Sequence, residues 1–297
     1  MRYRNQVISL DNSVLLTNGN PAGMASLLSL FHPSNSSYTC VTRPQADSPL
    51  IVGQVVHRAP EHSARLTFLM PSHLLPNPQL VPLLDELSCH AAEMGAFSVL
   101  AELEENHCIF EDMRNAGFTV YAWQHIWKMP ELKSDFSHLW RPALEEDTPA
   151  IHNLYQSLVP PLVQANDPPF PSRNTAWVHL HKGDVVAYAE ADYGLRGVYF
   201  RLVFHSDLDN NRELLDGLVG SITSMGRPIY ISVRLYQSQL DRYLRDLGAK
   251  ESPLYAVMVK HLTARLREHV LAKNRRRVEA TQVETTSGMA RNTVLKE

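Results

Sequence analysis

The sequence predicts a mixed α/β fold in which two similar halves follow one another along the chain. Apolar runs with strand character alternate with amphipathic helical patterns, and the same order of elements occurs twice. The chain has 297 residues, of which 44% are hydrophobic and 20% charged. That is enough for two cores of about 100 to 150 residues each.

The first half is predicted to contain two strands, a helix, a strand, a helix and a last strand. The strand patterns are 50–58, 64–70, 97–103 and 118–129. The first helix starts near Leu80 and the second at Asn106, each with apolar residues at helical spacing. Gly95 and Gly117 follow these helices directly, in the position where a helix commonly ends on glycine.

The second half repeats this order. Its strand patterns are 185–193, 197–204, 229–233 and 254–262, and its helical patterns lie near 209–225 and 238–247. A shift of 131 residues places Leu100 on Ile231 and Gly117 on Gly248, so apolar residues match apolar residues and glycine matches glycine. The sequence therefore predicts an N-terminal domain over 1–130, a C-terminal domain over 138–263 and a basic helical or disordered tail over 264–297.

Charge and composition narrow the range of functions. The net charge is −3, yet the tail carries eight Lys or Arg against four Glu, which leaves the rest of the chain at −7. An acidic body argues against a nucleic-acid groove, because phosphate binding needs clustered Lys and Arg. No apolar run approaches the roughly 20 residues of a membrane span, and no signal peptide is evident, so we expect a cytoplasmic protein without membrane contact.

One helix pattern resembles a known family. In it, an Asn opens the helix and a Gly-aromatic pair closes it three turns later; the residues are Asn106, Ile109, Met113, Gly117 and Phe118. The pattern is similar to the GNAT superfamily of acyl-CoA-dependent N-acyltransferases. Residues 139–163 resemble the first strand and helix of such a domain, and 242–249 its later helix end. The resemblance covers roughly residues 5–263 and implies two tandem GNAT-like domains, each with a central mixed sheet flanked by helices.

The resemblance also implies how acyl-CoA would be held, and the residues at those positions oppose it. Free backbone N–H groups should follow the fourth strand of each domain, but residues 71–79 contain three prolines, which lack that donor. The equivalent stretch of the second half has Asp207 and Asp209, which would repel a pyrophosphate. The general-acid tyrosine of the family falls on Met113 and Leu244. We therefore predict no catalytic residue.

Two hypotheses for function follow. The first is a catalytically degenerate tandem GNAT-like protein that acts by binding a small molecule or a protein partner and needs no cofactor. The alternative is an N-acyltransferase that uses acetyl-CoA or another acyl-CoA on an unknown amine. If acyl-CoA binding survives, the resemblance places its contacts between the fourth and fifth strands, near Leu69 with Asn106 and near Val203 with Gln237.

Two further pairs of polar residues are candidates for chemistry. Glu190 and Asp192 alternate along a predicted strand and share one face, where they could supply a general base; acids facing water are the more common interpretation. His179 and His181 share a strand face in the same way, but no third ligand accompanies them. The sequence therefore predicts no metal site.

Overall fold

The computed structural model describes residues 6–22, 35–43, 50–59, 61–130, 137–169, 175–205, 211–223 and 226–262. The predicted tail, 264–297, lies outside the described residues, as do Asp207 and Asp209. Within the described residues, no helix is long and apolar enough to cross a membrane.

The first half contains the predicted elements and an N-terminal addition. The strands are β1 (Ile8–Ser9), β2 (Asn35–Thr42), β3 (Ile51–Arg58), β4 (Ser63–Met70), β5 (Ser98–Glu104) and β6 (Thr119–Lys128). The helices are α1 (Asn12–Asn18), the short η1 (Ser72–Leu74), α3 (Leu80–Glu93) and α4 (Phe110–Asn115). Periodicity predicted β3 to β6 and α3 to within a few residues, whereas α4 starts later than Asn106, which lies in an exposed turn.

The second half repeats the order and adds two helices before its sheet. Its strands are β7 (Arg141–Pro142), β8 (Ala176–His181), β9 (Asp184–Tyr193), β10 (Val198–Phe204), β11 (Ile229–Arg234), β12 (Lys250–Glu251) and β13 (Tyr255–His261). Its helices are α5 (Thr148–Leu158), α6 (Pro161–Asn166), α7 (Asn211–Thr223) and α8 (Gln239–Asp246), with single turns η2 (Ser137–Leu139), η3 (Glu145–Asp147) and η4 (Leu235–Gln237). The predicted mixed α/β architecture with an internal repeat is confirmed.

The glycines that were aligned by the repeat end equivalent helices. Gly117 follows α4 with φ +88° and Gly248 follows α8 with φ +81°, a left-handed conformation that residues with a Cβ rarely adopt. The N–H of Gly117 bonds to the carbonyl of Arg114, and that of Gly248 to the carbonyl of Arg245. The same device thus turns the chain into the strand that follows each helix.

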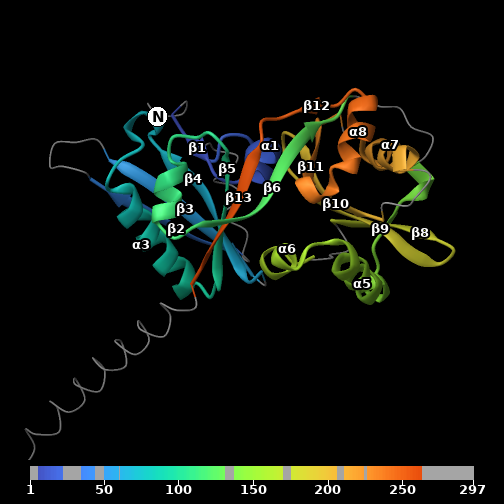
Figure 1. The fold of residues 1–297 in the computed structure, drawn as a ribbon, viewed down its shortest axis with the longest axis horizontal. Coiled ribbons are helices and arrows are strands. Elements are labelled where there is room, and N and C mark those ends of the chain that lie inside the picture. Colours follow the sequence, from blue (N-terminus) through green and yellow to red (C-terminus); the bar gives the residue numbers. More distant parts are fainter. Residues whose placement is uncertain are drawn as a thin grey trace, which may run out of the picture.

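The two halves share one sheet and exchange their last strands. Its order is β2-β3-β4-β5-β13-β6-β11-β10-β9-β8-β7. The final strand β13 therefore lies between β5 and β6 of the first half, antiparallel to both, while β6 pairs with β11 of the second half. Figure 1 shows β13 and β6 crossing the junction between the halves. The predicted boundaries at 130 and 138 stay a prediction, because the sheet runs through both halves.

Helices cover the sheet on both faces. On one face, α3 and α4 pack over the first half and α7 and α8 over the second, each pair on its own apolar cluster. A third cluster, on the other face, joins α5 and α6 to central strands through residues such as Ile151, Val163, Tyr121 and Val257. Helix α1 lies at the junction and contacts β9 and β10 of the second half (Figure 1). The junction is therefore built from segments far apart in the sequence, among them α1 and β13.

Candidate functional site

In the first half, the chain's own N-terminal segment closes the opening between β4 and β5. These parallel strands pair only over residues 63–65 and 98–100 and then diverge. Beyond that point β1 pairs with β4, with Ile8 opposite Leu69. The N–H of Leu10 donates to the carbonyl of Thr67 at 3.0 Å, and the N–H of Glu102 donates to the carbonyl of Leu10 at 2.8 Å. Leu10 thus bridges the two diverging strands by its backbone.

Backbone N–H groups of the proline-rich loop after β4 also donate to acceptors within the chain. The N–H of Ser72 donates to the carbonyl of Gln6, and the N–H of Leu75 to that of Ser72. At the start of α3, the N–H groups of Gln79 and Leu80 donate to the side chain and carbonyl of Asn77. An anion needs several N–H groups pointing outward, so this loop does not form a pyrophosphate nest.

In the second half, a glutamine side chain closes the equivalent opening. Strands β10 and β11 pair over residues 198–201 and 229–232 and then diverge. The buried Gln237 donates from Nε2 to the carbonyl of Leu202 at 2.6 Å and accepts the N–H of Arg234 on Oε1 at 3.2 Å. The strand backbone that could contact a bound chain is therefore occupied by this amide.

The four residues predicted to contact acyl-CoA lie as follows. Leu69 is fully buried and faces Ile8 across the β1–β4 ladder, while Asn106 is exposed after β5. Val203 lines a cavity of about 40 Å³ next to the buried Gln237, so these two do lie at the divergence of β10 and β11. In both halves, backbone groups at the opening are hydrogen-bonded within the chain.

A larger cleft lies between the two halves. It has a volume of about 470 Å³, within the range of small-molecule sites. One wall comes from β3, β4 and β5 of the first half, and the other from β9 and β10 of the second. The chain after α6, Asp167 to Pro169, also lines it. The charged side chains that line the cleft are Arg58, Glu61, Arg65, Asp167, Glu190, Asp192 and Arg201.

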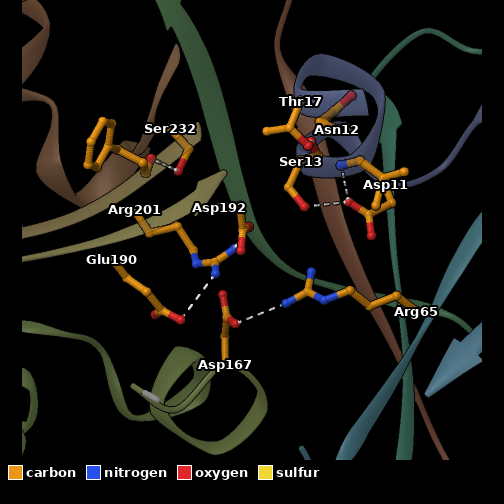
Figure 2. A network of polar contacts seen from close by, with 12 residues as sticks. Asp11, Asn12, Ser13, Thr17, Arg65, Asp167, Glu190, Asp192, Arg201 and Ser232 are labelled. Carbon is orange, nitrogen blue, oxygen red and sulfur yellow. Dashed lines mark hydrogen bonds and ion pairs between the residues drawn. The ribbon is translucent and has the colours of Figure 1, made fainter. Parts of the chain in front are cut away.

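The charges in the cleft form two connected groups, and Figure 2 shows Arg201 with its two acids and the contact between Asp167 and Arg65. Arg201 on β10 lies between two acids of β9, with Nη2 at 3.3 Å from Glu190 and Nη1 at 3.1 Å from Asp192. Asp167 at the end of α6 spans the halves, because one oxygen lies 3.5 Å from Arg65 on β4 and the other 2.8 Å from Arg234 on β11. The side chains retain 9 to 27% exposure, so they are deep yet reachable.

Burial and the nearby arginines shift the pKa values of these acids in opposite directions. Burial raises the pKa of Glu190, and Arg201 only partly offsets it. Burial acts on Asp192 in the same direction, but Arg201, Arg58 and Arg65 outweigh it and lower its pKa. Asp167 is likewise held below its usual pKa, because the arginines around it outweigh its burial. Burial therefore raises the pKa of one cleft acid, and arginines lower the pKa of its two neighbours.

Glu190 and Asp192, interpreted from the sequence as acids facing water, line the cleft between the halves rather than an open surface. They do share a strand face, as predicted, but that face is the wall of the cleft and both acids pair with Arg201. The sequence analysis missed Arg65 and Arg201. A signal existed, since each interrupts an apolar strand pattern, and a charge within a buried strand requires a partner.

The two predicted histidines lie in different surroundings. His179 is buried, and its Nδ1 bonds to the carbonyl of Leu139 at 2.8 Å, while His181 is exposed. A shift in the strand register falls between His179 and Leu180. Across the part of the chain that the structure describes, no three His, Cys, Asp or Glu side chains gather in a way that would hold a metal ion.

Comparisons with known proteins concern the fold. A scan of family models and a search of curated proteins found no match. Among solved structures, the chain is similar to a GCN5-related N-acetyltransferase from Sphaerobacter thermophilus, with 11% identity over 72% of this chain and 78% of that one and a TM-score of 0.47. It is also similar to a tandem GNAT protein from the clavulanic acid biosynthesis pathway, with 11% identity over 86% and 98% and a TM-score of 0.46.

A third similar structure is a GCN5-related N-acetyltransferase from Kribbella flavida, with 15% identity, coverage of 80% of this chain and 93% of that one, and a TM-score of 0.46. Similarity at this level carries no information on activity, so function has to be argued from the residues of this chain.

Proposed function

We propose that this chain is a ligand-binding protein of tandem GNAT-like architecture, which binds a small polar molecule in the cleft between its halves and transfers no acyl group. The observation that carries the proposal is the closure of both strand openings by the chain itself, through Leu10 in the first half and Gln237 in the second. A cleft of about 470 Å³ lined by charged groups lies beside them.

The cost of burying the cleft charges supports a binding role. Charged side chains are expensive to remove from water, and ion pairs rarely repay that cost in stability. Arg65 and Arg201 nevertheless lie on strands that contribute to the apolar clusters, three quarters or more buried at the side chain. Charges kept at such a position point to a use other than stability.

The test is acyl-CoA binding measured by differential scanning fluorimetry and turnover measured by mass spectrometry. Acetyl-CoA and longer acyl-CoAs are added to the purified chain at about a hundred times a micromolar dissociation constant. Binding at that excess would add roughly 2.7 kcal/mol of stability, which is a readily measured shift. We expect no shift and no acylated product from pooled amines, with an active N-acyltransferase as the control for the reagents. Micromolar acyl-CoA binding would refute the proposal.

The second candidate is an acyl-CoA-dependent N-acyltransferase. One observation favours it: the pKa of Glu190 is raised and that of the neighbouring Asp192 is lowered. In many enzymes, two acids whose pKa values differ in this way act as the general acid and the general base. An acylated product that disappears in Glu190→Gln, and persists in the surface variant Glu111→Gln, would favour this candidate over the first.

A further inference from the structure

The two walls of the cleft carry opposite charge. The first-half wall presents Arg58 from β3 and Arg65 from β4, with Glu61 as its acid. The opposite side presents Glu190 and Asp192 from β9 and Asp167 from the end of α6, with Arg201 as its base. In Figure 2, Arg65 approaches from one side, and Arg201 with its two acids from the other. A cation is therefore favoured on one side of the cleft and an anion on the other.

These charges are incompletely matched within the protein. Arg201 has two carboxylates as partners, and Asp167 provides the contact across the cleft to Arg65 at a loose 3.5 Å. Asp167 is the one ion-pair partner of Arg65 among the described residues, although Asp11 and Glu61 also lie near enough to act on its charge. A guanidinium has five N–H donors, so this loose ion pair leaves Arg65 with donors for a ligand.

On the acid side, Glu190 and Asp192 share Arg201 as their one ion-pair partner among the described residues, whereas Asp167 also pairs with Arg234 at 2.8 Å. A ligand group of positive charge there would restore the balance.

The entrance of the cleft adds an apolar contact. Phe97 is 53% exposed and stacks on His62, with 5.4 Å between the ring centroids, and both line the cleft. An exposed aromatic ring beside a charged interior suits a ligand with a carbon skeleton as well as charges. The cleft volume suits a small metabolite better than a peptide.

We infer that the ligand of this cleft is a small zwitterion, with an ammonium group against Glu190 and Asp192 and a carboxylate against Arg58 and Arg65. This inference rests on the proposed function and specifies its ligand class. An ammonium compound without the anion would leave the arginine wall unmatched. A carboxylate without the cation would face three acids and gain less from the arginines. A molecule with both charges is complementary to both walls.

The test compares matched compounds on the full-length chain by isothermal titration calorimetry. One set is L-phenylalanine, 2-phenylethylamine and 3-phenylpropanoate, which share a ring and differ in charge. The others are 4-aminobutanoate with butylamine and butanoate, and 6-aminohexanoate with hexylamine and hexanoate, which vary the distance between charges. We expect at least one zwitterion to bind at least tenfold more tightly than both of its singly charged counterparts. A panel without binding, or equal affinity within each set, overturns the inference.

Single substitutions test which wall of the cleft binds the ammonium and which binds the carboxylate of the ligand. Arg65→Gln is expected to weaken the bound zwitterion roughly ten- to hundredfold and to leave its amine counterpart unaffected. Glu190→Gln should weaken the zwitterion similarly and leave the acid counterpart unaffected. Arg58→Gln, on the neighbouring strand, is the second variant if Arg65→Gln fails to fold. Arg114→Gln and Glu111→Gln remove an exposed ion pair on α4 and serve as controls. Equal losses for zwitterion and amine in both arginine variants contradict the assignment.

The outcome is separable from that of the proposed function. A chain that binds neither acyl-CoA nor any zwitterion leaves the proposed function standing with another small polar ligand and overturns the zwitterion inference. Acyl-CoA binding together with a zwitterion refutes the non-catalytic role and keeps the ligand class. Acyl-CoA binding alone refutes both.

Discussion

The N-terminal segment should be an integral part of the core, and Leu10→Ala tests this. The first residues of a chain usually fray and tolerate substitution. Leu10, however, is 1% exposed and belongs to the apolar cluster under α3, while its backbone bridges β4 and β5. The substitution leaves those backbone hydrogen bonds available and removes only the side chain beyond Cβ. It therefore measures the packing of this segment.

The expected loss is about 3 kcal/mol. Removing three buried carbons forfeits roughly 2.4 kcal/mol at about 0.8 kcal/mol each. The cavity left behind adds to this, and Leu→Ala substitutions in cores cost about 2.7 to 5.0 kcal/mol. We place the expectation toward the lower end of that range.

Urea denaturation followed by tryptophan fluorescence gives the free energy of unfolding. The matched control is Leu195→Ala, in the loop between β9 and β10, where the side chain is 70% exposed and the cost should stay within about 0.5 kcal/mol. A loss below about 1 kcal/mol for Leu10→Ala, or one equal to the control, would refute the claim that this segment closes the opening. It would also remove the main support for the proposed function.

Three other substitutions probe separate contacts. Gln237→Ala should cost about 1 to 3 kcal/mol in urea denaturation, because a buried carbonyl and N–H lose their partner, whereas the exposed Gln239→Ala should be neutral. Arg141 donates hydrogen bonds to Asp147 from Nη1 and Nη2, and these bonds are the largest cause of the lowered pKa of Asp147. The pair therefore stabilises the fold above about pH 4, and this stabilisation is lost as pH falls through the lowered pKa. Asp147→Asn should cost about 1 kcal/mol at pH 7 and less at pH 2. Burial raises the pKa of Glu102, so the free energy of unfolding should fall as pH rises from about 4 through that raised pKa. Glu102→Gln should remove this pH dependence. A variant whose stability depends on pH as in the unsubstituted chain would contradict the role given to Glu102.

Local patterns predicted the elements, because each depends on residues close in sequence. The apolar positions of α3 recur at helical spacing and are buried as expected, among them Leu83, Leu84 and Leu87. Gly117 and Gly248 end equivalent helices, as the repeat predicted. The short elements β1 and α1 were missed, since residues 8–18 show neither a clear alternation nor a helical stripe. Their conformation depends on partners about 60 to 90 positions away, such as Leu69 and Glu102.

The cleft could not be predicted because its residues come from distant parts of the chain. Arg65 and Asp167 are 102 positions apart and meet only when the halves share a sheet. The sequence correctly placed Glu190 and Asp192 on one strand face. It could not show whether that face is exposed to solvent or lines a cleft. The sequence did show one arginine in each of two apolar strands. Such an arginine is expected to be buried beside an acidic partner, but the sequence does not say which acid that is.

The strand exchange explains why the junction can hold such a cleft. Because β13 completes the sheet of the first half and β6 extends that of the second, the junction is a continuous hydrogen-bonded ladder rather than two surfaces in contact. On β6, Trp123 packs against the cluster of the first half and Trp127 belongs to that of the second, so one strand is fixed in both cores. A rigid junction of this kind holds the facing charges at a set distance without help from a ligand. That is the geometry a binding site needs, since less ordering free energy is then lost when the ligand binds.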